Sequence, residues 1–335
     1  MNNHQTALVL GATGGIGGAI AAALLRHGWQ IRGLARDAAQ ARRTAPQQLA
    51  GIQWIAGNAM QRDAVVRAAD GAAVIVHAVN PPGYRDWDKC VLPMMANTIA
   101  AARAAGGARV VLPGTIYNFN PSTSAVVDGD TAQLPRSRKG MVRVAMERQL
   151  LGAAPEVPSL ILRAGDFFGP GARSSWFAQA MVKPGRPLRR IVNPARGSGH
   201  SWAYLPDLAE AFARLLDAPQ RLRVIECLQF EGLVDTHGHA LIDALNRSAG
   251  RTLPVFRFPW WLMQALAPFG GFPREAADIA SSWQNPMRLD NRRLEELIGP
   301  EPRTALDEAV HQTLVNLGCV PQCQERAPLV TAMMR

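Results

Sequence analysis

Cysteine is scarce in this sequence of 335 residues, which has only four. Cys90, Cys227, Cys319 and Cys323 are too few and too widely spread for a disulfide framework, so we expect free thiols. His311 lies upstream of the last pair, but the spacing matches no usual zinc pattern and a fourth ligand is missing. We therefore predict neither a disulfide-stabilised protein nor a metal site.

Long apolar runs are missing as well. No run approaches about 20 residues, so no segment is predicted to span a membrane. The polar residues 1–6 lead straight into an apolar run, without the basic start, apolar core and cleavage site of a signal peptide. The cytoplasm is therefore the expected location.

Lysine is nearly absent from a basic chain. Lys89, Lys139 and Lys183 are the three lysines among 36 basic residues, which leaves 33 arginines, and the net charge is +10. The arginines are scattered and form no recognised nucleic-acid-binding module, so we expect no nucleic-acid partner. An arginine-rich surface is expected instead, with some arginines binding phosphate or carboxylate groups.

The first half of the chain alternates between two patterns. Apolar runs typical of strands lie at residues 7–10, 30–35, 52–56, 73–78, 109–112 and 159–162. Helical periodicity separates them, over residues 17–27, 61–70, 86–105 and 138–152. Gly28, Gly71 and Gly106–Gly107 stand where helices should end, because a left-handed residue often ends a helix. This alternation predicts an α/β fold with a parallel sheet covered on both faces.

A glycine-rich loop joins the first strand pattern to the first helix pattern. Gly11 permits a tight turn, Gly14 lets the backbone approach a pyrophosphate, and Gly17 lets the helix pack on the strand. Free N–H groups at the start of the helix would then face the phosphates. We expect a dinucleotide site here, which also uses the other residues of the loop, Thr13, Gly15 and Ile16.

The second strand pattern bears on the choice of dinucleotide. An acidic residue about 20 positions after the glycine loop usually holds the ribose of NAD, whereas an arginine accommodates the 2′-phosphate of NADP. Arg36 occupies this place and predicts NADP, while Asp37 directly after it keeps NAD open.

The alternation ends near residue 164. A last strand-like run lies at 222–229, and helical segments follow near 236–250, 274–284 and 304–317. We predict a Rossmann-type doubly wound sheet in a dinucleotide-binding domain over 1–164, to which 197–230 return. Residues 165–196 and 231–335 are predicted to form a smaller, mostly helical lobe, with the substrate between the two.

These residues resemble the extended short-chain dehydrogenase/reductases of the NAD-dependent epimerase/dehydratase type, from residue 7 to about 215. Beside the glycine loop, the resemblance rests on four segments, Gly57-Asn58-Ala59, Pro113–Tyr117, Arg163–Pro170 and Tyr204–Asp207. It implies adenine contacts from Asn58, where the family has an aspartate, and from Ala59. It also implies cofactor contacts at Ala78 and Arg143.

The catalytic residues of that family are replaced here. The resemblance implies a tyrosine that moves a proton, a lysine four residues later and a serine or threonine after the fifth strand. Lys139, Arg143 and Pro113 stand at these three places. Arg143 keeps a positive charge and ribose hydrogen bonds, whereas Lys139 would donate a proton only if its charged form were disfavoured; a solvated surface lysine is the alternative. Other candidates for the proton donor are Thr115 and Tyr117.

The substrate side of the site departs from the family too. Asp166 stands where the family often has an asparagine, and His200 stands where sugar-nucleotide enzymes have an arginine for the diphosphate. Arginines that would compensate are Arg173, Arg186, Arg189, Arg190 and Arg196. We expect Asp207 to cap the following helix.

An aromatic segment, Phe256–Phe269, is the least ordinary part of the second half. It predicts the wall of an apolar pocket or core, with a membrane surface bound through Trp260 and Trp261 as the alternative.

Together these features predict an NAD(P)-dependent oxidoreductase or epimerase-like enzyme. Its substrate would be a small hydroxy or carbonyl compound, and its proton donor would be atypical. The alternative is a cofactor-binding protein that has lost the reaction and works as a redox sensor or assembly partner. A homodimer is left open.

Overall fold

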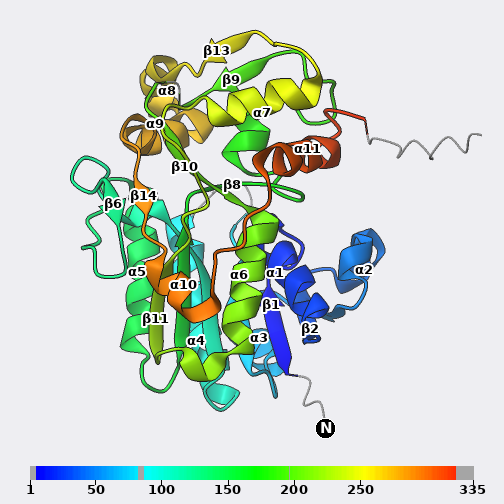
Figure 1. The fold of residues 1–335 in the computed structure, drawn as a ribbon. Helices are drawn as coiled ribbons and strands as arrows, with labels where there is room; N and C mark the ends of the chain where they lie inside the picture. Colours follow the sequence, from blue (N-terminus) through cyan, green and yellow to red (C-terminus); the bar gives the residue numbers. More distant parts are fainter. Residues whose placement is uncertain (1–4, 82–86, 196, 322–335) are drawn as a thin grey trace, which may run out of the picture.

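The computed structural model describes residues 5–81, 87–195 and 197–321, which form two lobes (Figure 1). The larger lobe holds a seven-stranded sheet, and the smaller lobe sits over one end of that sheet. None of the helices in these described ranges is long and apolar enough to cross a membrane.

The main sheet is parallel throughout and has the strand order β11-β7-β5-β4-β1-β2-β3. Its strands are β1 (Thr6–Leu10), β2 (Gln30–Ala35), β3 (Gln53–Ala56), β4 (Val74–His77), β5 (Arg109–Thr115), β7 (Ser159–Ala164) and β11 (Ile225–Gln229). The order reverses between β1 and β4. In open sheets of this kind ligands bind at the carboxyl ends of the strands next to such a reversal. The predicted α/β fold is confirmed.

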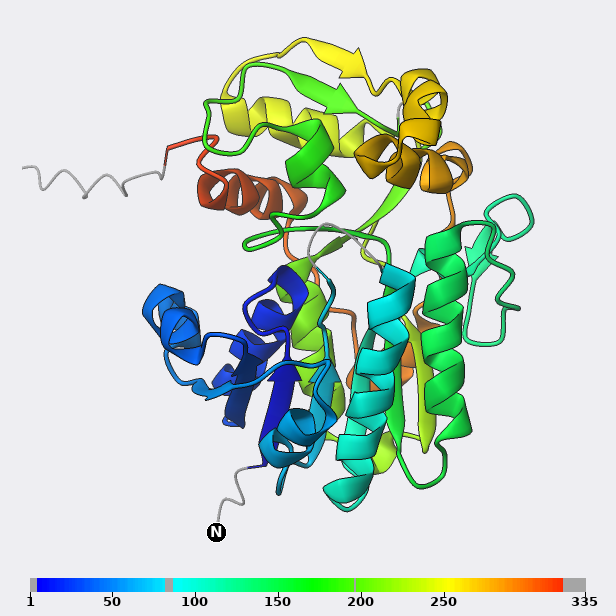
Figure 2. The same cartoon turned by 180° about the vertical axis from the view of Figure 1, so that it is seen from behind.

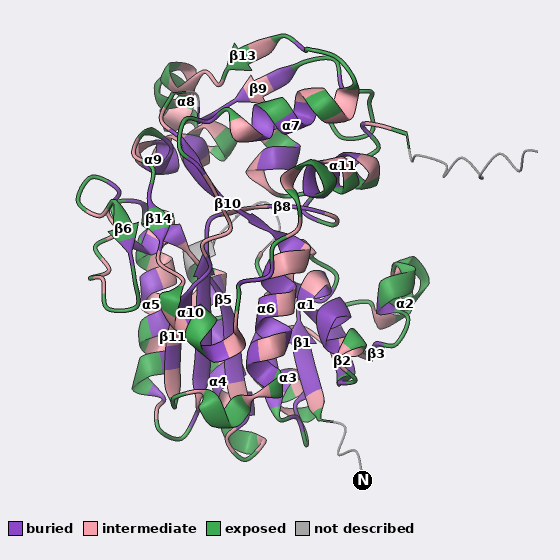
Figure 3. Ribbon diagram, viewed as in Figure 1, coloured by how far each residue is buried: buried purple, intermediate pink, exposed green. Residues whose placement is uncertain are grey.

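The alternation of residues along β1 explains why helices cover both faces. Ala7 and Val9 face a core with α1 (Gly15–Arg26), α2 (Ala38–Thr44) and α6 (Leu205–Asp217). Leu8 and Leu10 face the opposite core, with α3 (Arg62–Ala68), α4 (Trp87–Ala104) and α5 (Arg138–Gly152). Figure 2 shows α4 and α5 in front of the sheet, and Figure 3 shows its buried strands.

The local signals hold well in this lobe. The helix expected over 138–152 spans those residues, and the Ser137 hydroxyl accepts a hydrogen bond from Gly140 N at 3.0 Å as its cap. Gly28, Gly71 and Gly106 have the expected positive φ angles. β5 runs three residues past the predicted end, through Pro113. Because the β4 ladder ends at Val111, the missing N–H of Pro113 costs no bond on that side.

Asp207 does not cap α6 as expected, because the helix begins earlier. Tyr204 holds the capping position, and Asp207 lies in the first turn. Its carboxylate accepts hydrogen bonds from the N–H and hydroxyl of Thr304, at 2.7 and 2.6 Å. Asp207 therefore ties α6 to the chain that leads into α11 (Leu306–Asn316).

The smaller lobe has its own core, in which helices pack around short strands. Its helices are α7 (Ala240–Ala249), α8 (Trp260–Leu266), α9 (Gly271–Gln284) and α11, and its strands are β8 (Asp166–Phe168), β9 (Ile191–Asn193), β10 (His200–Tyr204), β12 (Leu233–Asp235) and β13 (Val255–Arg257). A short parallel pair, β6 (Val126–Val127) with β14 (Arg288–Leu289), joins the loop after β5 to the chain after α9.

One segment near the C-terminus belongs to the larger lobe, although the sequence predicted it in the smaller one. Residues 231–335 were assigned to the smaller lobe, but α10 (Arg292–Ile298) packs against α6 and β11. Leu294 and Leu297, three residues apart on one helix face, are buried in the core of the larger lobe. This short return was not visible in the sequence because seven residues carry little periodicity.

Candidate functional site

The glycine loop lies at the carboxyl end of β1, beside the reversal in strand order. Gly14 N donates to Gly11 O at 2.9 Å, which closes a tight turn before α1. A side chain on Gly11 would come within 2.5 Å of Ala78 O, and one on Gly17 within 2.2 Å of Gly11 O. Both positions therefore admit only glycine, while Thr13 and Gly14 are exposed at the crest of the loop.

The end of β2 presents Arg36 to solvent on the same edge of the sheet. Asp37, which had kept NAD open, accepts a hydrogen bond from Gln40 N at 2.8 Å and caps α2. One carboxylate oxygen of Asp37 is thus used within the helix cap, whereas Arg36 lies beside it at the strand end.

The turn after β3 is held by its own hydrogen bonds. Asn58 Oδ1 accepts from Met60 N at 3.0 Å, and Asn97 Nδ2 donates to the buried Ala59 at its carbonyl, at 2.9 Å. The Asn58 carbonyl oxygen is thus used within the turn.

His77, at the end of β4, was missed by the sequence reasoning. It is 2% exposed, and its Nδ1 lies 2.8 Å from Thr98 Oγ1, which itself donates to Met94 O. Burial, and then the nearby charge of Arg143, lowers the pKa of His77 to about 3. The imidazole is neutral, and within the described ranges its Nε2 has no hydrogen-bond partner. The charge of Arg143 on α5 therefore lies close enough to act on His77 at the end of β4.

Lys139 has a partner that the sequence did not indicate. Its Nζ lies 3.1 Å from Glu275 Oε2 on α9, and the side chain is only 15% exposed. The backbone N–H groups of Arg138 and Lys139 donate to the Asp278 carboxylate of the same helix, at 3.1 and 3.3 Å. The alternative of a solvated lysine is therefore wrong, since Lys139 joins the start of α5 to the smaller lobe.

Three predicted site residues come together at the carboxyl ends of β5 and β7. The Tyr117 hydroxyl donates to Asp166 Oδ2 at 2.7 Å, and His200 Nε2 lies 2.7 Å from the same oxygen. Tyr117 comes from the short helix η3 (Ile116–Asn118) after β5, and Asp166 begins β8, two residues after the end of β7. His200 arrives on β10, which pairs with β8. We call Tyr117, Asp166 and His200 the polar triad.

Burial divides the polar triad into an accessible part and a supporting part. The Asp166 side chain is 13% exposed, whereas His200 is 1% exposed and stacks on Trp283 at 3.6 Å between ring centroids. His200 was predicted to contact the substrate itself, but its side chain is buried and faces Asp166. Trp283 had no signal in the sequence beyond its helix, and its buried Nε1 has no partner in the described part of the chain.

A buried ion pair braces the turn that carries Tyr117. Arg163 Nη2 and Nε donate to the two Glu147 oxygens, at 2.7 and 3.1 Å, and both side chains are at most 3% exposed. Asn118 Nδ2 donates to Glu147 Oε1 at 2.7 Å. Thr115 Oγ1 accepts from Tyr117 N at 3.3 Å, so this candidate proton donor caps the same turn. α5, β7 and η3 therefore hold Tyr117 in place together.

The compensating arginines are dispersed. Arg173 lies in the loop whose Gly171 and Ala172 backbone atoms pack against Gly15 of the glycine loop. Arg186, Arg189 and Arg190 are exposed before β9 in the smaller lobe. Arg196 and Cys323 fall outside the described residues, and within the described ranges no three metal-binding side chains gather.

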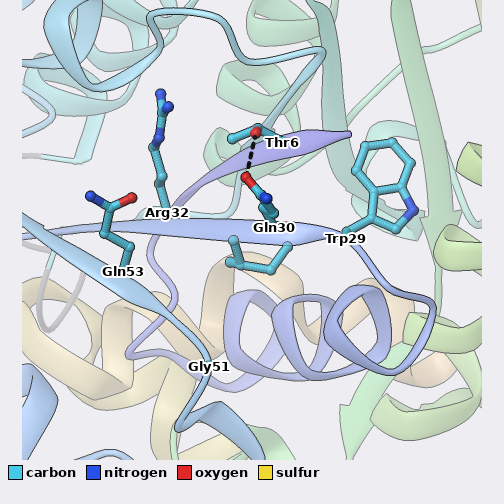
Figure 4. A pocket seen from close by; sticks show the side chains of 7 residues that line it. Thr6, Trp29, Gln30, Arg32, Gly51 and Gln53 are labelled. Carbon is cyan, nitrogen blue, oxygen red and sulfur yellow. Dashed lines mark hydrogen bonds between the residues drawn. The ribbon is translucent and has the colours of Figure 1, made fainter. Parts of the chain in front are cut away.

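A pocket of about 280 Å³ lies at the opposite end of the sheet (Figure 4). Its lining includes Thr6, Gln30 and Gln53, which begin β1, β2 and β3. The glycine loop follows the other end of β1. Because dinucleotides bind at the carboxyl ends of parallel strands, this pocket is separate from the cofactor site.

Comparison with known proteins agrees with this geometry. A family of NAD(P)H-binding domains matches residues 11–137. Solved structures with the same fold include a UDP-glucuronic acid 4-epimerase from Bacillus cereus, bound to UDP-glucuronic acid and NAD, with a TM-score of 0.71 at 15% identity; it covers 93% of this chain and 99% of its own. A UDP-glucose 4-epimerase from Bifidobacterium longum, bound to NAD+ and UDP, has a TM-score of 0.71 at 13% identity over 93% of this chain and 98% of its own.

One curated relative is a reductase. The 3-diazoavenalumate denitrifying reductase of a Streptomyces species is 26% identical over 304 residues, which are 83% of this chain and 95% of that protein. Residues 11–137 thus match a family of NAD(P)H-binding domains, and the chain has the fold of the two solved epimerases.

Proposed function

We propose that this protein is an NADP-dependent oxidoreductase whose small-molecule substrate is processed beside Tyr117 and Asp166. The observation that carries the proposal is the 2.7 Å hydrogen bond between these two side chains, at the carboxyl ends of β5 and β7. The same edge of the sheet carries the glycine loop, so a cofactor bound there would lie on the same edge as the polar triad.

The preference for NADP over NAD rests on the end of β2. Arg36 is an exposed guanidinium, which suits the 2′-phosphate of NADP because it carries a permanent charge and several donors. Asp37 would serve the ribose of NAD, but it caps α2. We also assign the crest of the glycine loop to the pyrophosphate, Asn58 to adenine and Arg143 to the nicotinamide ribose.

The polar triad is suited to moving one proton. A bound nicotinamide would exchange a hydride with the substrate carbon. The Tyr117 hydroxyl already donates to Asp166, so its oxygen lone pairs are the groups that accept a proton from a substrate alcohol. As that proton reaches Tyr117, the phenolic proton passes to Asp166, and the substrate becomes a carbonyl. Carbonyl reduction runs the same transfers backwards, with His200 holding the carboxylate throughout.

A second candidate follows from the replaced catalytic residues and the curated relative. Lys139 is held in an ion pair, and Pro113 has no side-chain donor. Reductive removal of nitrogen from an aryl diazonium needs a hydride but no proton, since the aryl cation equivalent and the hydride give the arene and dinitrogen. A site without the usual proton donor can carry this reaction. The relative named for denitrifying a diazo compound makes it the second substrate class to test.

The first test is calorimetric titration with NADPH and NADH, followed by NADPH oxidation with a carbonyl panel and an aryl diazonium. Tyr117→Phe separates the two reactions. We expect a loss of at least about a hundredfold in carbonyl turnover, because the proton path is broken. Diazonium turnover should change little.

Tyr204→Phe is the matched control, because the Tyr204 hydroxyl bonds to Gln312 in the smaller lobe, away from Asp166. Tight NADPH binding without turnover on either substrate class would favour the alternative of a sensor that has lost the reaction. If neither cofactor binds, the enzyme proposal fails.

A further inference from the structure

The aromatic segment of the smaller lobe has an unusual charge pattern. Residues 254–274 contain no aspartate or glutamate, and their two charged residues are Arg257 and Arg274. Between these arginines lie only apolar residues, glycines, prolines and one glutamine. The segment spans the end of β13, then α8, the short helix η6 (Ala267–Phe269) and the start of α9.

Large aromatic rings on this segment face solvent. Phe269 is 85% exposed, Trp261 71%, Phe256 52% and Phe272 46%. Neither α8 nor η6, both fully described, has a buried residue. Figure 1 shows β13, α8 and α9 together at one corner of the smaller lobe, and α8, η6 and α9 pack on one another. We call Phe256, Trp261, Phe269 and Phe272 the aromatic face.

The contacts of Trp260, next to Trp261 in the chain, show that α8 is firmly packed on the lobe although its neighbouring rings are exposed. Trp260 Nε1 donates to Pro194 O at 3.0 Å, and its ring packs on Phe258 and Trp176 at centroid distances of 4.6 and 5.6 Å. Trp260 therefore anchors α8 to the lobe, while Trp261, the next residue, stays in solvent. The expectation of a core or pocket wall holds for Trp260 and Phe258 and fails for Phe256, Trp261 and Phe269. Phe272 is intermediate, because its half-exposed ring also packs on Trp176 at 5.8 Å between centroids.

We propose that the aromatic face binds the surface of a bilayer that contains anionic lipids. Tryptophan and phenylalanine enter the boundary between headgroups and acyl chains, and arginines beside them bind lipid phosphates. The Arg274 side chain is fixed beside the exposed aromatic rings, because its Nε donates to Ala267 O of η6 at 3.3 Å. The absence of acidic residues from the segment and the net charge of +10 remove repulsion from an anionic surface.

The charge of the segment also argues against a second copy of the chain as the partner that covers the aromatic face. Packing this face against itself about a two-fold axis would bring Arg257 and Arg274 of both copies to one interface without acidic partners from the segment. An anionic membrane supplies the opposite charge, so it fits both the apolar and the basic part of the surface.

Vesicle flotation of the full chain tests this surface. We expect the protein to float with vesicles of equal amounts of phosphatidylcholine and phosphatidylglycerol at low salt, and not with phosphatidylcholine alone. The double variant Trp261→Ala/Phe269→Ala should bind at least about tenfold more weakly. Arg257→Gln should weaken binding less and reduce its salt dependence.

The matched control is Leu151→Ala/Val224→Ala, which removes two exposed apolar side chains, 44% and 48% exposed, from the larger lobe. It should float like the parent protein. Thermal unfolding of each variant verifies that the fold is kept.

Three results would overturn the proposal. The first is no flotation with the anionic vesicles, and the second is equal flotation of the parent protein and Trp261→Ala/Phe269→Ala. The third is a dimer in light scattering, without vesicles, that this double variant dissociates, because the occupant would then be a second copy. None of these readouts depends on NADPH binding or turnover, so the failure of this proposal is distinguishable from the failure of the proposed function.

Discussion

The glycine loop and the polar triad lie on the same edge of the sheet but are built in different ways. The loop uses main-chain groups of consecutive residues, and its geometry depends on missing side chains at Gly11 and Gly17. The polar triad uses side chains from three elements, with Tyr117 and Asp166 separated by 49 positions in the chain. Backbone sites are thus specified locally, whereas the polar triad depends on how distant elements pack.

The largest expected effect comes from breaking the brace of the polar triad. Glu147→Gln leaves the buried charge of Arg163 without its counter-ion, which should lower the free energy of unfolding by about 3 kcal/mol. Denaturant unfolding measures this. Glu156→Gln is the control, since the Arg103–Glu156 pair is exposed at 50% and 68% and should contribute less than about 1 kcal/mol. Equal losses in the two variants would contradict the role given to Glu147.

Gly17→Ala tests the glycine loop, the site that is built from main-chain groups. Its new Cβ would meet Gly11 O at 2.2 Å, so the loop must move and NADPH affinity should fall by roughly a hundredfold, about 3 kcal/mol. Titration calorimetry measures the affinity. Gly152→Ala, where a Cβ meets nothing within 4 Å, should bind NADPH as the parent does. Unchanged binding in Gly17→Ala would mean that the loop does not hold the pyrophosphate.

The next prediction concerns His77, at the end of β4 on the same sheet edge as the glycine loop, and the pH dependence of stability. Its pKa of about 3 in the folded protein lies below the ordinary 6.5, so the unfolded chain binds the proton more readily. Stability from this group is therefore complete above pH 6.5 and declines as the pH falls towards 3. Between pH 7 and pH 5 the loss should be about 2 kcal/mol. Unfolding of the parent and of His77→Gln at both pH values isolates it, and the same pH dependence in both proteins would rule His77 out.

The smallest expected effect concerns cofactor choice. Arg36→Ala should weaken NADPH binding by about tenfold and leave NADH binding unchanged, because only the 2′-phosphate contact is lost. Arg67→Ala, an exposed arginine on α3, is the control for the general loss of charge. Equal weakening of NADPH and NADH in Arg36→Ala would show that Arg36 does not read the phosphate.

Much of the larger lobe was predictable because its signals are local. The strand patterns, the helix over 138–152 and the glycines that end helices all appear where they were expected. The partners of Lys139 and the buried His77 could not be found in this way. Glu275 and Asp278 lie more than a hundred residues beyond Lys139, and nothing in the residues around His77 marks its Nε2 as unpartnered.

The sequence by itself determined the strand, glycine loop and helix that begin the chain, because neighbouring residues and the steric needs of a tight turn suffice for such a unit. It also placed Arg36 at the end of β2 and Tyr117 after β5. Only the tertiary structure decided that Asp166 meets Tyr117, that His200 is buried behind it and that Trp261 faces solvent beside a Trp260 that packs on Phe258 and Trp176. Those outcomes depend on the packing of elements far apart in the chain, which local periodicity does not encode.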